Sequence, residues 1–115
     1  MSTPPAIIVT GSIVTSPESM AELLEASLAH VHRSRAEPGC IEHGVYLDSE
    51  DPNRVFFFER WADRAALDEH FVQMGSADFL GAVQRLAVGR TTLDIFEVGD
   101  SPAPGDGSHR YPPSS

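Results

Sequence analysis

The 115-residue chain has 41% hydrophobic residues and a formal net charge of -9, which suits one globular domain with its own core. Its eight Lys and Arg are scattered, so nucleic acid and anionic membranes are excluded as partners. A single cysteine, Cys40, excludes an internal disulfide, and no Cys and His spacing typical of a zinc site occurs. Without a basic leader or an 18-residue apolar run, the protein is expected to be cytoplasmic.

The first half of the chain predicts a strand, a helix and a second strand. Ala6–Thr15 is rich in the β-branched residues that favour strands. Ser16 followed by Pro17 is typical of a helix start with the serine as N-cap, and the helix should run to about Arg35. A Pro-Gly pair then breaks the chain before the strand Cys40–Leu47. The helix face expected to point inward carries Met20, Leu23, Leu24, Ser27, Leu28 and Val31.

The middle of the chain predicts a hairpin into a buried strand, followed by a helix. Four consecutive apolar residues, Val55–Phe58, indicate a strand buried on both faces, which Trp61 closes. Asp63 is a good N-cap, because its carboxylate can accept hydrogen bonds from the first amides of the next helix. His70 should point inward, because the helix spacing i, i+3, i+4 and i+7 is filled by Leu67, His70, Phe71 and Met74.

The last third predicts another helical piece over Ser76–Val88 and a final strand over Thr91–Val98. From Gly99 the composition changes to Gly, Pro, Ser and Asp, with no periodic apolar residues to offset the entropy of ordering. We therefore expect one domain over residues 1–99 and a flexible tail over residues 100–115.

The order of the elements is strand, helix, strand, strand, helix, strand, which predicts a ferredoxin-like α+β fold. Such a fold has a four-stranded antiparallel sheet with its helices on one face. The third and fourth strands are apolar on both sides, and leaving those side chains in water would cost several kcal/mol of a total stability of ~5 to 15 kcal/mol. A homodimer with two sheets stacked face to face is therefore expected.

Several motifs resemble those of the antibiotic biosynthesis monooxygenase family. They are Glu37-Pro38-Gly39-Cys40, Asp51-Pro52-Asn53, the run Phe58–Asp63, and Ala65-Ala66-Leu67 leading to His70. The resemblance covers about Ile7–Val98 and implies a dimeric α/β barrel. Several members oxidise phenolic, quinol or anthrone-type substrates with O2 and without metal or flavin, whereas others are isomerases or haem-degrading enzymes.

The same resemblance argues against haem. It places Val83 where haem-degrading relatives have their iron-ligating histidine, and Gly11 or Ser12 where they have an asparagine on the first strand. His70 falls where those relatives have a tryptophan. In some phenol-oxidising relatives an asparagine and a tyrosine surround the substrate, and the matching positions here are apolar.

Oxidation without a cofactor needs a dry pocket for a flat ring, a base, and space for O2. His43 and His70 are the candidate catalytic bases, since an imidazole with its ordinary pKa of ~6.5 accepts a proton near neutral pH. Phe57 and Trp61 share one strand face, and the resemblance places a ligand-facing tryptophan at Trp61. The other candidates for substrate contact are Phe71, Tyr46 and Glu59. Ordinary core packing is the alternative for each.

The predicted function is a cofactor-independent monooxygenase that oxidises a quinol or phenolic small molecule, with O2 as co-substrate and no metal or organic cofactor. The expected partners are that small aromatic substrate and a second copy of the chain. Two alternatives stay open: a non-catalytic or stress-response module that binds a small aromatic molecule, and a cofactor-free isomerase that uses the same base without O2.

Overall fold

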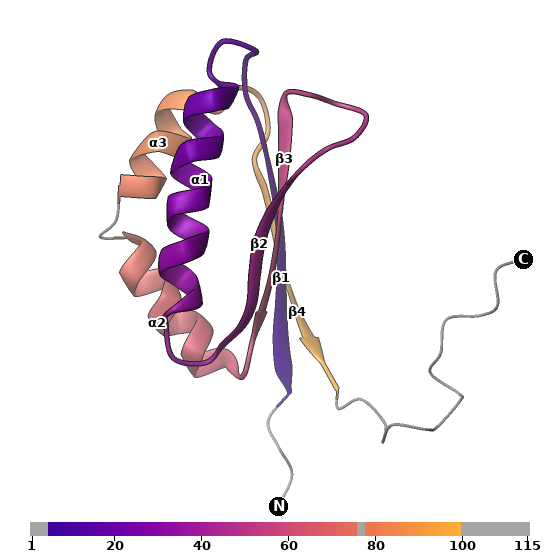
Figure 1. The fold of residues 1–115 in the computed structure, drawn as a ribbon. Coiled ribbons are helices and arrows are strands. Elements are labelled where there is room, and N and C mark those ends of the chain that lie inside the picture. Colours follow the sequence, from indigo (N-terminus) through magenta and orange to yellow (C-terminus); the bar gives the residue numbers. More distant parts are fainter. Residues whose placement is uncertain (1–4, 76–77, 100–115) are drawn as a thin grey trace, which may run out of the picture.

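The computed structural model describes residues 5–75 and 78–99, and it places three helices on one face of a four-stranded sheet (Figure 1). The elements are β1 (Ala6–Val14), α1 (Met20–Arg35), β2 (Cys40–Leu47), β3 (Arg54–Trp61), α2 (Arg64–Gly75), α3 (Asp78–Leu86) and β4 (Thr92–Val98). The strand order is β2-β3-β1-β4 and every pair is antiparallel. The predicted ferredoxin-like α+β fold is confirmed. The predicted tail, residues 100–115, lies outside the described residues.

The two predicted helix caps have different outcomes. α1 begins at Met20, and the predicted N-cap at Ser16 is wrong. The Ser16 carbonyl accepts a hydrogen bond from the Ser19 N–H at 3.1 Å, so a turn precedes the helix and Ser19 takes the N-cap position. Asp63 does cap α2, because its Oδ1 accepts a hydrogen bond at 2.9 Å from the backbone N–H three residues further on.

The inward stripe of α1 is rotated relative to the predicted one. Its buried residues are Leu23, Ser27, His30, Val31 and Ser34. Leu28, predicted to face the core, is 40% exposed. The rotation brings His30 into the interior.

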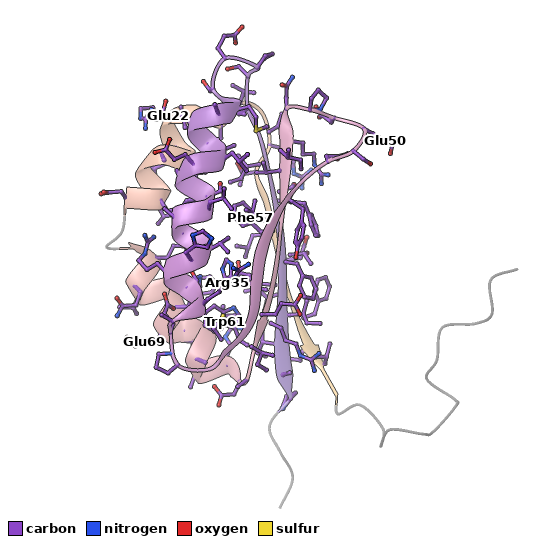
Figure 2. The ribbon with its side chains drawn as sticks, viewed as in Figure 1. Glu22, Arg35, Glu50, Phe57, Trp61 and Glu69 are labelled. Carbon is purple, nitrogen blue, oxygen red and sulfur yellow. The ribbon has the colours of Figure 1, made fainter. Side chains whose placement is uncertain are left out.

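The core consists of two apolar clusters with a polar layer between them. One cluster surrounds Val55 and Phe57 of β3, and the other surrounds Trp61 at the end of the same strand. These three side chains lie on the same face of β3, which is the face that packs against the helices. Figure 2 shows Phe57 and Trp61 between the sheet and the helix layer. Glu59 lies between them on the same face, so a buried carboxylate separates the two apolar clusters.

The other face of the sheet carries no helix in the part of the chain that the structure describes (Figure 1). Tyr46 pairs with Phe56 across β2 and β3, and Tyr46 and Phe96 are 51% and 50% exposed. A face-to-face homodimer over this surface stays a prediction. Among the described residues, no helix is long and apolar enough to span a membrane.

Candidate functional site

Three buried imidazoles from three elements meet between the sheet and the helices. His30 comes from α1, His43 from β2 and His70 from α2, and the three residues are 3%, 2% and 1% exposed. Their ring centroids lie 5.2 Å apart for His30 and His43, 5.3 Å for His30 and His70, and 5.5 Å for His43 and His70. We call these three side chains the histidine cluster.

A β-bulge turns His43 toward this cluster. Cys40 pairs with Trp61 on β3, but the register shifts between Cys40 and Glu42 because β2 has one extra residue there. His43 consequently pairs with Glu59 on the helix side of the sheet. Strict alternation from Cys40 would have placed this imidazole on the opposite face, because a register shift of one residue reverses the direction of every later side chain.

Glu59 is the carboxylate that the cluster surrounds. Its Oε1 accepts a hydrogen bond from Trp61 Nε1 at 2.9 Å and lies 3.8 Å from His70 Nε2. Its Oε2 lies 3.4 Å from His43 Nε2. Burial raises the pKa of Glu59, whereas the Trp61 hydrogen bond and the nearby His70 work in the opposite direction. Trp61 itself is 0% exposed, so its indole orients Glu59 from within the core.

A second carboxylate orients His70 from the other side. His70 Nδ1 lies 2.9 Å from Oε1 of Glu37, which belongs to the loop between α1 and β2. Glu37 also lines an open groove of about 650 Å³ beside Arg33 and Pro38. The histidine cluster therefore connects to the protein surface through the pair of His70 and Glu37.

Two members of the cluster are neutral at pH 7. Burial lowers the pKa of His30 to about 3, and His43, His70 and Arg33 add to the effect. Burial also lowers the pKa of His43 to about 3, followed by His70 and Arg35. Each of these imidazoles therefore keeps a nitrogen lone pair near neutral pH.

A cavity of about 110 Å³ lies beside the cluster, between the sheet and the three helices. Its wall is mostly apolar, and His30 and Glu59 are its only ionisable side chains among the described residues. Phe79 also lines it and stacks on His30, with ring centroids 4.2 Å apart and an interplanar angle of 5°. The cavity is thus an apolar space with an imidazole and a carboxylate on one side.

The predicted site residues divide into those on the cavity wall and those behind it. Phe57 and Glu59 line the cavity. His43, His70 and Trp61 are buried next to Glu59 and are not among the lining residues. The predicted histidines therefore reach the cavity through the carboxylate that they contact.

Two predicted contact residues lie elsewhere. Phe71 packs against the apolar cluster around Trp61, and Tyr46 projects from the open face of the sheet. His30 also belongs to the site, although no sequence pattern singled it out. The sequence feature that could have revealed it is its position seven residues after Leu23, because this spacing places His30 on the buried face of α1 two turns further along.

Comparison with known proteins shows what the chain is similar to. The family model for antibiotic biosynthesis monooxygenase matches residues 6–85. An uncharacterized Synechocystis protein is 33% identical over 95 residues, which cover 83% of this chain and 65% of that protein. Rv0793 of Mycobacterium tuberculosis, provisionally named a monooxygenase, is 34% identical over 70 residues, or 61% of this chain and 66% of that protein. The matches thus span just under two thirds of each relative.

Solved structures show the same fold. The structure of Rv0793 has a TM-score of 0.71 at 25% identity, and the match covers 85% of this chain and 99% of that one. A conserved protein of Methanosarcina mazei has a TM-score of 0.76 at 24% identity, covering 84% of this chain and 95% of that one. At this level of identity the second comparison bears on the fold alone.

Proposed function

Because the chain belongs to the antibiotic biosynthesis monooxygenase family, we propose that it is a monooxygenase that oxidises a small phenol or quinol with O2. The observation that carries the proposal is the apolar cavity of about 110 Å³ with His30 and Glu59 on its wall. In this proposal O2 is the co-substrate, and the reaction needs no flavin, haem or metal.

The cavity volume limits the substrate to about one ring. An apolar cavity of ~150 Å³ in another protein holds benzene, so a phenol requires only a small movement of the lining side chains. Met74 lines this cavity, and its unbranched side chain can make that movement. Fused-ring substrates would require a much larger opening.

The chemistry needs the protein to take one proton from the substrate and later to return it. A base in the cavity takes the hydroxyl proton, and the resulting anion gives one electron to O2 to form a substrate radical and superoxide. The two radicals combine at a ring carbon that bears hydrogen, and the peroxide anion that forms takes the proton back. Loss of water, which includes the ring hydrogen, then leaves a carbonyl there. A phenol and O2 thereby become a quinone and one water. The protein positions the ring, removes and returns the proton, and excludes solvent.

Glu59 and His30 are the groups proposed to take this proton, because they line the cavity that is proposed to hold the substrate. His43 and His70 then act behind Glu59, at 3.4 and 3.8 Å from its oxygens. The contact of His70 with Glu37, at 2.9 Å, continues the path toward the surface groove. The predicted base histidines are thus assigned to relaying the proton to and from Glu59.

Oxygen uptake by the chelator-treated protein with a panel of single-ring phenols and quinols tests the proposal. The wild type should exceed the buffer rate, and Glu59→Gln should lose at least about a hundredfold in kcat, as expected for loss of a general base. His32→Ala is the matched control, because His32 lies on α1 but is exposed. No uptake above buffer, or an unchanged rate in both Glu59→Gln and His30→Ala, would contradict it.

The same panel separates the two alternatives. Saturable phenol binding without turnover would indicate a non-catalytic binding module. Product formation that continues under argon would indicate an isomerase, because such a reaction does not consume O2.

A further inference from the structure

We propose that His30, His43 and His70 form a binding site for one divalent first-row transition metal ion. One ring nitrogen from each of the three residues lies within 4.8 Å of the other two. The site goes beyond the proposed oxygenation, which needs no metal. It also differs from the sequence expectation of no metal, since the three ligands come from α1, β2 and α2 and form no local motif.

The spacing of the nitrogens is close to that of a metal-bound set. Metal to nitrogen bonds of ~2.1 Å at a tetrahedral angle hold the nitrogens about 3.4 Å apart. The rings therefore need to approach by at most about 1.4 Å, which small side-chain rotations can supply. Because the ligands sit on two helices and a strand, the backbone already holds the three side chains together.

The cluster also offers nitrogens that lack other partners. In the part of the chain that the structure describes, both ring nitrogens of His43 and Nε2 of His70 are buried without a hydrogen-bond partner. Buried polar atoms are nearly always satisfied in folded proteins, so several orphaned nitrogens at one point call for an explanation. His30 Nδ1 lies 3.4 Å from Arg33, which leaves its Nε2 as the ligand atom.

Two carboxylates complete the surroundings of a metal centre. Glu37 contacts His70 Nδ1 at 2.9 Å, so a metal-bound His70 would donate its Nδ1 proton to this carboxylate and coordinate the ion through Nε2. Glu59 lies 3.4 Å from His43 Nε2 and uses its other oxygen for Trp61. The Glu59 oxygen that faces His43, Oε2, can act as a fourth ligand or accept a hydrogen bond from a metal-bound water. Together the two carboxylates balance the charge of a divalent ion.

The donor set selects the class of ion. Three imidazoles suit Zn²⁺, Fe²⁺, Ni²⁺ or Cu²⁺, whereas Mg²⁺ and Ca²⁺ prefer sites built from oxygen atoms. The groove of about 650 Å³ that Glu37 lines brings solvent next to the second carboxylate and is the proposed route of entry.

Titration of the chelator-treated full chain with Zn²⁺ by calorimetry, and with Co²⁺ by visible absorption, tests the site. We expect one ion per chain, a higher Tm with Zn²⁺, and Co²⁺ d–d bands typical of nitrogen ligands. His43→Asn and His70→Gln should each weaken Zn²⁺ binding at least a hundredfold. Glu37→Gln, which leaves all three ligands in place, should weaken it about 10- to 100-fold.

His32 provides a matched control. It is exposed on α1, so His32→Ala should bind Zn²⁺ like the wild type. Absence of saturable binding of Zn²⁺ and Co²⁺, or binding lost in this control and kept in the cluster variants, would overturn the site. These readouts use no substrate, so the site and the proposed oxygenation can fail independently.

Discussion

Acidification from pH 7 to pH 5 is expected to destabilise the metal-free protein by about 4 kcal/mol. The cause is the pair His30 and His43, whose pKa is about 3 in the folded chain against an ordinary value of 6.5. Between these two values the unfolded chain binds protons at both residues and the folded chain does not. Stability is therefore complete above about pH 6.5 and is lost as the pH falls toward 3.

The magnitude follows from the difference between pH 5 and the pKa of about 6.5 that each histidine has in the unfolded chain. At pH 5 each imidazole lies about 1.5 pH units below that value, and each unit corresponds to about 1.4 kcal/mol, so each histidine contributes about 2 kcal/mol. Glu59, which faces His43 and His70, has a raised pKa and works in the opposite direction as the pH falls. The predicted loss is thus about 4 kcal/mol before this offset, a large part of a typical domain stability of ~5 to 15 kcal/mol.

Urea unfolding at pH 7, 6 and 5 with a chelator present measures the effect. The wild type should lose most of its pH-dependent stability below pH 6, and His43→Leu should show a pH dependence smaller by about 2 kcal/mol, because one titrating group is gone. His32→Ala should keep the full dependence, since His32 is exposed. A free energy of unfolding that changes by less than about 1 kcal/mol from pH 7 to pH 5 in the wild type would show that the folded chain does not hold these two imidazoles neutral.

Two further predictions concern positions that hold the site in place. Gly39 has φ +84° and a Cβ there would overlap the Ala66 side chain, whereas Gly89 has φ +71° with nothing within 4 Å of a new Cβ. In urea unfolding, Gly89→Ala should lower the free energy of unfolding by about 1 to 2 kcal/mol, because of its positive φ alone. Gly39→Ala should lower it by about 1 to 3 kcal/mol more than Gly89→Ala, because the new Cβ also overlaps Ala66 of α2. Equal losses would show that the overlap with α2 has no effect on stability. Trp61→Phe keeps an aromatic ring but removes the hydrogen bond to Glu59, at 2.9 Å, and should cost about 2 kcal/mol in the same assay. A loss below about 0.5 kcal/mol would mean that the indole N–H does not support the carboxylate.

Local sequence patterns were sufficient for most of the fold. Hydrophobic spacing and turn residues predict the order of strands and helices, and therefore the sheet. The same helical spacing places His70 on the inward face of α2, and Asp63 caps that helix as its side-chain chemistry predicts. The start of α1 was missed because Ser16 followed by Pro17 is typical of a helix start, whereas here a backbone turn from Ser16 to Ser19 comes first and the helix begins at Met20.

The amino-acid sequence alone is enough to place Phe57, Glu59 and Trp61 on one face of β3, because side chains in a strand change face at every residue, although the burial of both faces predicted for this strand is replaced by alternation in the single chain. The neighbours of that carboxylate depend on the tertiary fold. His43 contacts it because a bulge shifts the β2 register, and the rotation of α1 over the sheet brings His30 beside His43 and His70. Strand registers and helix rotations depend on packing between segments far apart in the sequence, and local propensity therefore cannot reveal that three distant histidines share one site.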